Sequence, residues 1–237
     1  MRRYSSLAWL RVTPGLGGAS PGQFVMLWVP GFEAVPMSIA WADDTGIEFI
    51  VRSVGETTQR LWGSKPGDTL GVIGPLGRGL DELVEPRGKY VLVGGGSGVA
   101  PILYSAAWLQ ARGLRVSVYL GFREPGEAAI REVFELHGVK VSVACEKMGE
   151  WCDERGTVVD AFRNEILGAD FVVAAGPLGM LREVYKHRRR NLIVVLESMV
   201  RCGLGFCGSC RLWENGPLLC RDGPVFRAES VARLLGS

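Results

Sequence analysis

The stretch YVLVGGGSGVAP, residues 90–101, decides the fold of the central part of the chain. It places a glycine-rich loop directly after an apolar run that predicts a buried strand, and directly before a helical segment. The free N–H groups and the dipole at a helix N-terminus favour anions, so this context predicts a site for a pyrophosphate. A tight turn between a strand and a helix, without any ligand, is the alternative interpretation.

The loop differs in two respects from the G-x-G-x-x-G pattern of dinucleotide-binding folds. Pro101 stands in the place of the third glycine, and the next predicted strand is followed by Arg123 and Glu124. Glu124 can accept a hydrogen bond from a ribose hydroxyl and Arg123 can bind a 2′-phosphate, so the choice between NAD and NADP stays open. The predicted nucleotide-binding residues are Gly94, Gly95, Gly96, Gly98 and Pro101, with Gly176 and Pro177 in a later turn.

Strands and helices alternate around this loop over residues 87–196, which predicts βαβ units and a parallel sheet. The Gly176-Pro177 turn follows a later predicted strand and therefore lies at the same carboxyl edge, where ligands of open α/β sheets bind. Strands are expected at Tyr90–Val93, Val116–Leu120, Lys140–Ala144, Phe171–Ala175 and Asn191–Leu196, and helices at Ile102–Arg112, Ala128–His137 and Val158–Leu167.

Residues 1–86 have a different pattern, in which short β runs are separated by clusters of Gly, Pro and Asp. Such regular spacing is typical of a small antiparallel barrel. The N-terminal residues predict a first strand, and further strands are expected at Phe24–Val29, Met37–Ala40, Ile47–Val54 and Thr69–Ile73.

Residues 197–237 contain four cysteines: Cys202, Cys207, Cys210 and Cys220. The first three have the C-x4-C-x2-C spacing of a [2Fe–2S] loop. Glycines between them permit the positive φ angles that a backbone needs to wrap closely around a cluster. A structural zinc site is the alternative, although zinc ligands usually come as two separated pairs. The four cysteines are therefore the predicted metal ligands.

Composition excludes several classes of function. The 27 Lys and Arg residues against 25 Asp and Glu give a net charge of +2, too little for a nucleic-acid partner. No apolar run is long enough to cross a membrane, and the N-terminus is too polar for a signal peptide. We therefore expect a cytoplasmic protein in a reducing compartment, where Cys145 and Cys152 remain free thiols. His137 and His187 lie in no motif and are expected on the surface.

Taken together, these features resemble the ferredoxin reductase family and, within it, the electron-transfer subunits of NAD-linked dihydroorotate dehydrogenases. The most specific part is ESMVRCGLGFCGSC, residues 197–210, followed by CRDGPVF, residues 220–226. The resemblance implies an α+β fold of several domains. These are an antiparallel β-barrel at residues 1–86 that binds FAD, a Rossmann-like α/β domain at residues 87–196 that binds NAD, and a small [2Fe-2S] domain at residues 197–237.

The resemblance also implies the function and the partner. Electrons taken from dihydroorotate by an FMN-containing catalytic subunit would pass through the [2Fe-2S] cluster and FAD to NAD+, in pyrimidine biosynthesis. Two copies of each subunit would form a heterotetramer. The cofactors supply the chemistry, so no catalytic acid or base is expected.

The flavin motif of the family, Arg-Pro-x-Ser, falls on Val35–Ser38, so its arginine is missing. Valine cannot donate hydrogen bonds to the flavin phosphates. Arg52, Arg60 and Arg78 are candidates to replace the lost charge. The resemblance places the flavin contacts at Val35, Pro36, Met37, Ser38, Ile50, Val51, Arg52, Thr57 and Thr58.

Two other functions stay open at this point. One is an electron-transfer subunit of another NAD(P)H-linked reductase, with a ferredoxin, sulfide or hydrogenase partner. The other is a flavin-free, zinc-binding regulatory subunit. The residues Leu204, Phe206, Leu212 and Trp213 are expected either to contact a partner or to pack the C-terminal segment against the sheet.

Overall fold

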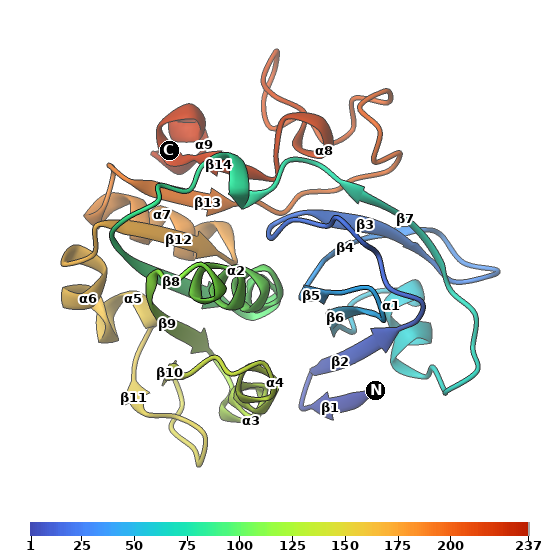
Figure 1. The fold of residues 1–237 in the computed structure, drawn as a ribbon, viewed down its shortest axis with the longest axis horizontal. Helices are drawn as coiled ribbons and strands as arrows, with labels where there is room; N and C mark the ends of the chain where they lie inside the picture. Colours follow the sequence, from blue (N-terminus) through green and yellow to red (C-terminus); the bar gives the residue numbers. More distant parts are fainter. Residues whose placement is uncertain (237) are drawn as a thin grey trace.

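The computed structural model describes residues 1–236, so Ser237, the last residue of the predicted C-terminal domain, lies outside the described residues. Figure 1 shows two lobes side by side, with the C-terminal segment above them. The N-terminal lobe consists of antiparallel strands, and the second lobe is built on a mostly parallel sheet with helices. This arrangement confirms the predicted α+β fold class. None of the helices described is both long and apolar enough to cross a membrane.

The N-terminal lobe contains two antiparallel sheets, in the orders β1-β2-β6-β5 and β4-β3-β7. Apolar side chains from both sheets fill the space between them, because alternate residues of each strand point inward. The strands are β1 (Arg2–Tyr4), β2 (Leu7–Val12), β3 (Phe24–Trp28), β4 (Val35–Ser38), β5 (Trp41–Ala42), β6 (Ile47–Arg52) and β7 (Gly71–Leu76), and the helix is α1 (Glu56–Trp62). We call this lobe the barrel.

The second lobe contains a seven-stranded sheet in the order β11-β10-β9-β8-β12-β13-β14. Tyr90–Val93 of β8 is fully buried, as expected for a central strand that is covered on both faces. The strands are β8 (Lys89–Gly95), β9 (Arg115–Phe122), β10 (Val141–Cys145), β11 (Glu154–Arg155), β12 (Phe171–Ala175), β13 (Leu192–Val195) and β14 (Val225–Arg227). All neighbours are parallel except β14, which comes from the C-terminal segment and lies antiparallel to β13.

The longest helix of the described chain, α2 (Val99–Ala111), packs between the sheet and the barrel (Figure 1). It is apolar on nearly all sides, because it is covered from both directions. Two predicted helices are each divided in two, at Ala129–Ile130 and at Phe162. The other helices are α3 (Pro125–Ala128), α4 (Arg131–Leu136), α5 (Val158–Ala161), α6 (Arg163–Leu167), α7 (Leu178–His187), α8 (Leu219–Asp222) and α9 (Ala232–Leu235), with 3₁₀ turns at Leu80–Glu82, Gly96–Gly98 and Ala228–Val231.

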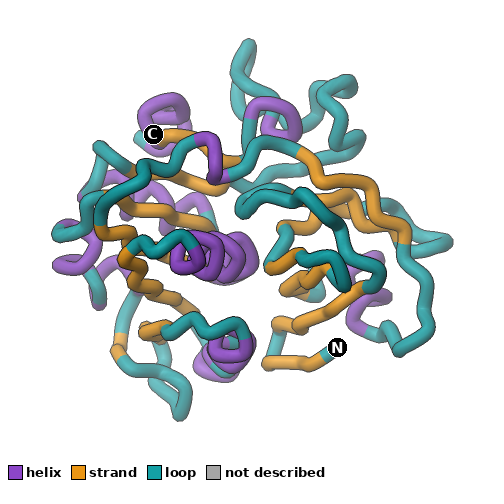
Figure 2. Tube along the Cα trace, in the orientation of Figure 1, coloured by secondary structure: helices purple, strands orange, loops and turns teal. Residues whose placement is uncertain are grey.

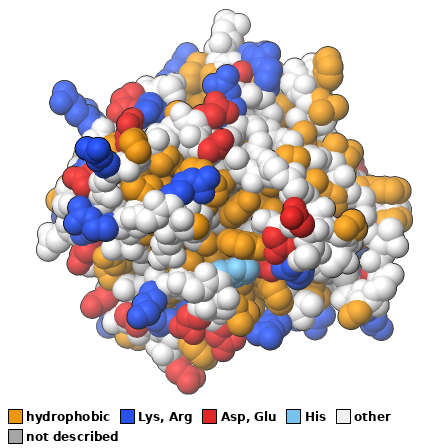
Figure 3. Space-filling view, in the orientation of Figure 1, with side chains coloured by type: hydrophobic (Ala, Val, Ile, Leu, Met, Phe, Trp, Pro, Cys, Tyr) orange, Lys and Arg blue, Asp and Glu red, His pale blue; other side chains and the backbone are white. Residues whose placement is uncertain are grey.

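Much of the C-terminal segment is loop, as the tube in Figure 2 shows for the part between β13 and α8. Acidic and basic side chains are interspersed on the face of the molecule shown in Figure 3, in keeping with the small net charge.

The two lobes are joined by buried polar contacts as well as by apolar packing. Glu48 of β6 is only 2% exposed, and its carboxylate accepts hydrogen bonds from Trp9 Nε1 and from Arg11. His137, after α4, places Nε2 2.8 Å from the same carboxylate. The prediction that His137 lies on the surface is wrong, because its ring packs against Trp41 at this junction.

Candidate functional site

The glycine loop lies at the point where the strand order of the sheet reverses. Gly94 and Gly95 end β8, Gly96–Gly98 form a 3₁₀ turn, and α2 follows. Strand β12 lies beside β8, and its turn, Gly176-Pro177, leads into α7. Nucleotides bind at such switch points in open α/β sheets. The structure therefore brings the two predicted glycine turns to one place.

Close approach explains the glycine at position 98. A Cβ atom there would collide with the backbone carbonyl of Ala175, so only glycine lets the two turns meet. Pro101 lies in the first turn of α2, where a missing N–H costs no helical hydrogen bond. The departure from a third glycine is thus compatible with the helix.

A cavity of about 180 Å³ opens between the barrel, the glycine loop and the C-terminal segment. Most of its lining is apolar, and Ser38, Ser97 and Glu197 are among the polar residues that line it. The predicted flavin residues Pro36, Met37, Ser38 and Ile50 lie here, together with Phe24, Ser97, Leu196, Glu197, Ser198, Val200, Leu219 and Pro224. The cavity thus joins residues from all three parts of the chain.

Ser97 and Glu197 form a polar pair at this cavity, which the predicted site residues do not include. The Ser97 hydroxyl donates a 2.8 Å hydrogen bond to Glu197 Oε2. The surrounding protein raises the pKa of Glu197, and this hydrogen bond opposes the rise. Both positions follow strands that end at the carboxyl edge of the sheet, β8 and β13, and that placement is the sequence signal that could have identified them.

The remaining predicted flavin residues lie away from the cavity lining. Val51 points into the barrel core, as expected for a strand residue next to Ile50. Thr57 and Thr58 begin α1, and their hydroxyls are already used: Thr57 donates to the Glu33 carbonyl, and Thr58 accepts from two backbone N–H groups. Val35 lies in β4, opposite Leu27 of β3.

Arg52 does not offer a free charge in place of the missing arginine. Its guanidinium forms a two-pronged ion pair with Glu127 of α3, at 2.6 and 2.9 Å, and also donates to Ser6 Oγ. Burial opposes ionisation of Glu127, but the hydrogen bonds from Arg52 and Ser6 hold its pKa below the usual range. Arg60 and Arg78 are paired as well, with Asp68 and with Glu82.

The four C-terminal cysteines are free thiols that lie as two neighbouring pairs. Cys210 and Cys220 are buried, with their Sγ atoms 3.3 Å apart. Cys202 is partly exposed and Cys207 is exposed, and Ser209 Oγ lies 3.1 Å from Cys207 Sγ. Within residues 1–236, no group of three or more His, Cys, Asp or Glu side chains is already arranged around a single metal position.

The two pairs differ in their electrostatics. Backbone N–H groups of Cys207 and Leu204 point at Cys202 Sγ and lower the pKa of this thiol to about 6. Burial raises the pKa of Cys220 to about 11, and the neighbouring Cys210 sulfur acts in the same direction. N–H groups aimed at sulfur and four cysteines in one segment suit an iron–sulfur cluster, whose positive iron ions offset the thiolate charge.

The apolar residues near the cysteines divide into two groups. Leu204 and Phe206 are exposed, at 57% and 87%, whereas Leu212 and Trp213 pack against the buried core. Packing against the sheet is therefore confirmed for Leu212 and Trp213, and contact with a partner stays a prediction for Leu204 and Phe206. An exposed phenylalanine beside a redox site is typical of a protein contact surface.

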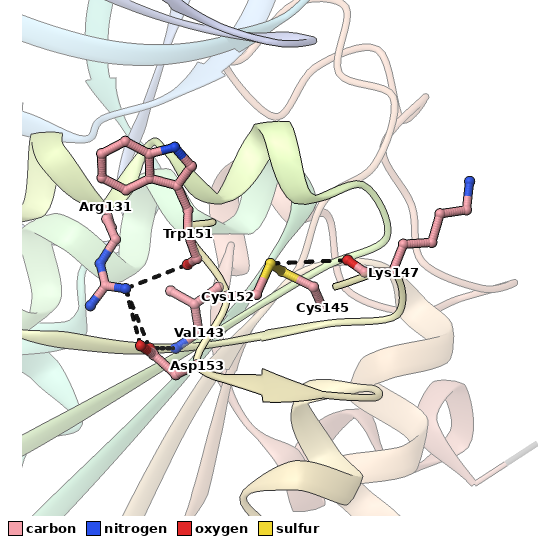
Figure 4. Close-up of a disulfide and its surroundings, with 7 residues drawn as sticks. All are labelled: Arg131, Val143, Cys145, Lys147, Trp151, Cys152 and Asp153. Carbon is pink, nitrogen blue, oxygen red and sulfur yellow. Dashed lines mark hydrogen bonds and ion pairs between the residues drawn. A yellow bond between two sulfur atoms is a disulfide. The ribbon is translucent and has the colours of Figure 1, made fainter. Parts of the chain in front are cut away.

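Cys145 and Cys152 form a disulfide, so the prediction of free thiols is wrong (Figure 4). The prediction relied on the reducing conditions of most intracellular compartments. Intracellular proteins of hyperthermophilic archaea and bacteria are the exception to that rule. Asn and Gln are scarce in this chain, six residues in total, and fewer of these residues is also a feature of hyperthermophilic proteins.

Comparisons with known proteins agree with this geometry. Residues 197–232 match the family described as the iron-sulfur cluster binding domain of dihydroorotate dehydrogenase B. The chain is 34% identical over 222 residues to a Thermococcus kodakarensis protein named probable dihydroorotate dehydrogenase B (NAD(+)), electron transfer subunit, covering 91% of this chain and 88% of that protein. An Archaeoglobus fulgidus protein of the same name is 36% identical over 217 residues, covering 89% and 87%.

The fold is similar to solved structures of reductases. The structure of an NADH-dependent reduced ferredoxin-NADP oxidoreductase superposes with a TM-score of 0.84 and 26% identity, covering 100% of this chain and 91% of that one. The ferredoxin reductase of carbazole 1,9a-dioxygenase superposes with a TM-score of 0.66 at 20% identity, covering 80% and 64%, which shows the shared fold alone. The family match favours iron–sulfur over zinc at the cysteines.

Proposed function

The chain belongs to the family of electron transfer subunits of NAD+-linked dihydroorotate dehydrogenase B, and from this premise we propose that it carries electrons from dihydroorotate, oxidised in a catalytic partner subunit, to NAD+. The observation that carries the proposal is the cavity bordered by the barrel, the glycine loop and the segment that leads to the cysteines. Residues of the predicted flavin site and of the glycine loop thus border one cavity, and Leu219, next to Cys220 in the chain, lines it as well, which suits electron relay between the three cofactors.

The residues present fit the three cofactors unequally. The glycine turns fit NAD(H), and Cys202, Cys207, Cys210 and Cys220 fit a [2Fe-2S] cluster. The apolar cavity lining fits the flavin ring of FAD, whereas the phosphate side lacks the motif arginine at Val35. Bound FAD would exchange hydride with NAD(H) and single electrons with the cluster, and would thereby connect the two-electron carrier with the one-electron carrier.

The protein contributes orientation and exclusion of water. Phe24, Met37 and Ile50 form apolar walls around the cavity. Glu197 lies beside the cavity, and the Ser97 hydroxyl orients its carboxylate by donating to Oε2. These groups set the environment of the redox centres, in keeping with the expectation that no residue acts as a catalytic acid or base on substrate.

The catalytic partner contacts the exposed apolar residues beside the cysteines. Leu204 and Phe206 stand out of the loop that carries Cys202 and Cys207, so a subunit bound there lies close to the cluster ligands. Desolvated aromatic side chains commonly supply much of the binding energy of an interface. The proposal includes an FMN in that partner and an assembly with two copies of each subunit.

A second candidate function is electron transfer in a ferredoxin-NADP oxidoreductase. The superposition on the NADH-dependent reduced ferredoxin-NADP oxidoreductase structure, with a TM-score of 0.84, favours it. The two candidates share cofactors and differ in the partner, so an assay with each partner distinguishes them.

The experiment is purification of the chain together with a dihydroorotate-oxidising FMN subunit, under anaerobic conditions. We expect iron and FAD in the complex and reduction of NAD+ when dihydroorotate is added. Phe206→Ala should weaken the complex while leaving NADH oxidation with an artificial acceptor unchanged. Reduction of ferredoxin but no dihydroorotate-dependent reduction of NAD+ would favour the second candidate, and zinc in place of iron would contradict both.

Val35→Arg tests the flavin site. If the phosphates of FAD lie near β4, the new guanidinium should tighten FAD binding by about tenfold, the effect of one charge-assisted hydrogen bond. The measurement is flavin fluorescence during titration of the flavin-free chain. Val35→Lys is the control, because it adds charge without the paired donors of arginine. Unchanged affinity in both variants would place the phosphates elsewhere.

A further inference from the structure

The disulfide lies at the nucleotide edge of the sheet. Cys145 is the last residue of β10, fully buried, and pairs with Phe122 of β9. Cys152 is partly exposed and precedes β11, which adds to the sheet beside β10. The bond therefore closes a short loop, residues 146–151, at the carboxyl ends of β9 and β10 (Figure 4).

The first part of this loop is bonded to the segment that follows β9. The Glu146 N–H donates to the Phe122 carbonyl at 3.0 Å, and the Lys147 N–H donates to the Arg123 carbonyl at 3.3 Å. Side chains add two ion pairs: Lys147 Nζ lies 2.6 Å from Glu124 Oε1, and Arg123 Nε lies 3.7 Å from Glu146 Oε1. Two cations and two anions thus offset one another.

Arg123 and Glu124 occupy the position that contacts ribose in dinucleotide-binding sheets. The order β10-β9-β8-β12-β13 is that of the Rossmann fold, in which a residue after the second strand binds the ribose hydroxyls or a 2′-phosphate. Here the second strand is β9, next to the strand that carries the glycine loop. Arg123 and Glu124 are exposed, with side-chain accessibilities of 87% and 54%, so burial does not fix them. Their positions depend on residues 146–147.

The far end of the loop is held without the disulfide. Asp153 accepts a 2.7 Å hydrogen bond from the Val143 N–H and pairs with Arg131, which also donates to the Trp151 carbonyl. These bonds, drawn in Figure 4, fix residues 151–153 to β10 and α4. The covalent bond to Cys145 is what links this fixed end back to the start of the loop.

We propose that the Cys145–Cys152 disulfide is a positioning element for nucleotide binding. By holding Glu146 and Lys147 in place, it lets Glu124 accept hydrogen bonds from the ribose hydroxyls of NAD(H). It also keeps Arg123 and Lys147 paired with acidic side chains, so that neither cation is free to bind the 2′-phosphate of NADP(H). The inference rests on the proposed function, since it assumes that NAD(H) binds at the glycine loop. It assigns a preference for NADH over NADPH to this edge of the sheet.

The first experiment counts the free thiols of the full chain after the protein has been denatured and its iron removed, with no reductant present. Cys145 and Cys152 should resist alkylation while the other four cysteines react. The second measures NADH and NADPH affinity of the intact, cofactor-loaded chain by fluorescence titration, together with KM and kcat with an artificial acceptor. Cys145→Ala with Cys152→Ala should weaken NADH binding about tenfold, the effect of losing an ordered charged hydrogen bond, with kcat unchanged.

The preference for NADH over NADPH should fall in the same variant, because Arg123 and Lys147 are no longer held against their acidic partners. Val231→Ala is the matched control, since it destabilises a buried site beside β13 and β14, at the opposite edge of the sheet. It should lower thermal stability without altering either nucleotide affinity. Cys152→Ala alone, which keeps the buried Cys145 thiol, serves if the double variant does not fold.

Glu124→Gln shows whether the disulfide acts through this carboxylate. If it does, Glu124→Gln weakens NADH binding in the wild-type background and has little further effect in the variant without the disulfide. Unchanged NADH affinity without the disulfide, while Glu124→Gln still weakens binding, would overturn the inference and leave the proposed function intact. A wild-type chain that binds neither nucleotide would overturn both.

Discussion

The six cysteines of this chain lie in two environments that lead to different chemistry. Cys145 and Cys152 stand with Cα atoms 5.8 Å apart at adjoining strand ends, within the range that a disulfide spans. Cys202, Cys207, Cys210 and Cys220 are free thiols in the C-terminal segment, and backbone N–H groups that point at Cys202 Sγ favour its thiolate, whereas Cys210 and Cys220 are buried. Backbone geometry around each thiol therefore decides whether it bonds to a second sulfur or remains available to metal.

The largest effect is expected from replacing one of the four C-terminal cysteines that are the predicted metal ligands. Cys207→Ser should reduce the iron content and dihydroorotate-dependent reduction of NAD+ to background, because a serine hydroxyl is a much poorer iron ligand than a thiolate. Iron analysis and the absorbance spectrum provide the measurement. Ser209→Ala, which removes only the hydroxyl 3.1 Å from Cys207 Sγ, is the matched control and should retain iron. Full iron content in Cys207→Ser would show that this residue is not a ligand.

Replacing Cys145 and Cys152 should lower the stability of the fold and leave the iron content unchanged. Loss of the Cys145–Cys152 bond, across a sequence separation of 7, should lower the free energy of unfolding by about 2–3 kcal/mol, since the unfolded chain regains the entropy of a closed loop. Thermal unfolding of the double alanine variant measures this, with iron determined on the same sample. Loss of iron from this variant would contradict the comparison, because it would mean that the C-terminal cysteines depend on the disulfide.

The pH dependence of alkylation sharpens the comparison. In the iron-free chain, Cys202 has a pKa of about 6, so its thiolate dominates at pH 7 and its alkylation rate should fall about tenfold per pH unit below pH 6. Cys220, with a pKa of about 11, should react slowly throughout, and Cys145 and Cys152 should not react at any pH. Peptide mapping after short pulses of iodoacetamide separates the sites. Equal rates at Cys202 and Cys220 would contradict the assigned environments.

The smallest effect is expected from Asp153→Asn, which removes a charge beside the disulfide without touching it. The carboxylate is 42% exposed and its ion pair with Arg131 spans 3.2 Å, so we expect a loss of at most about 1 kcal/mol. Chemical denaturation measures it. A loss as large as that of the disulfide variant would mean that polar contacts, rather than the covalent bond, fix this loop.

The sequence predicted those features that depend on local pattern. The buried strand before the glycine loop, the helix after it and the alternation of strands and helices follow from apolar runs and glycine positions. The four C-terminal cysteines were predicted to be metal ligands from their spacing, because three cysteines within one loop leave few other interpretations. The break at Phe162 was not predicted, because no glycine or proline lies within the predicted helix Val158–Leu167.

Features that depend on contacts between distant segments were not predictable in this way. The ion pair of Arg52 with Glu127 joins residues 75 positions apart, so the sequence could offer Arg52 as a flavin-phosphate ligand but could not show that another lobe already binds it. The same holds for His137, whose partner Glu48 lies in β6 of the barrel. Buried charges are held by partners that only the packing of the two lobes supplies.

The sequence by itself determined which chemical groups the chain carries: a glycine-rich loop between a strand and a helix, four cysteines with the spacing of an iron–sulfur segment, and valine in place of the motif arginine. The tertiary structure decided which of these groups meet. It brought Ser38, Ser97 and Glu197 to one cavity and joined Cys145 to Cys152. The physical reason is that residue type and spacing act over a few residues, whereas ion pairs, disulfides and cavities depend on distances set by the packing of whole elements.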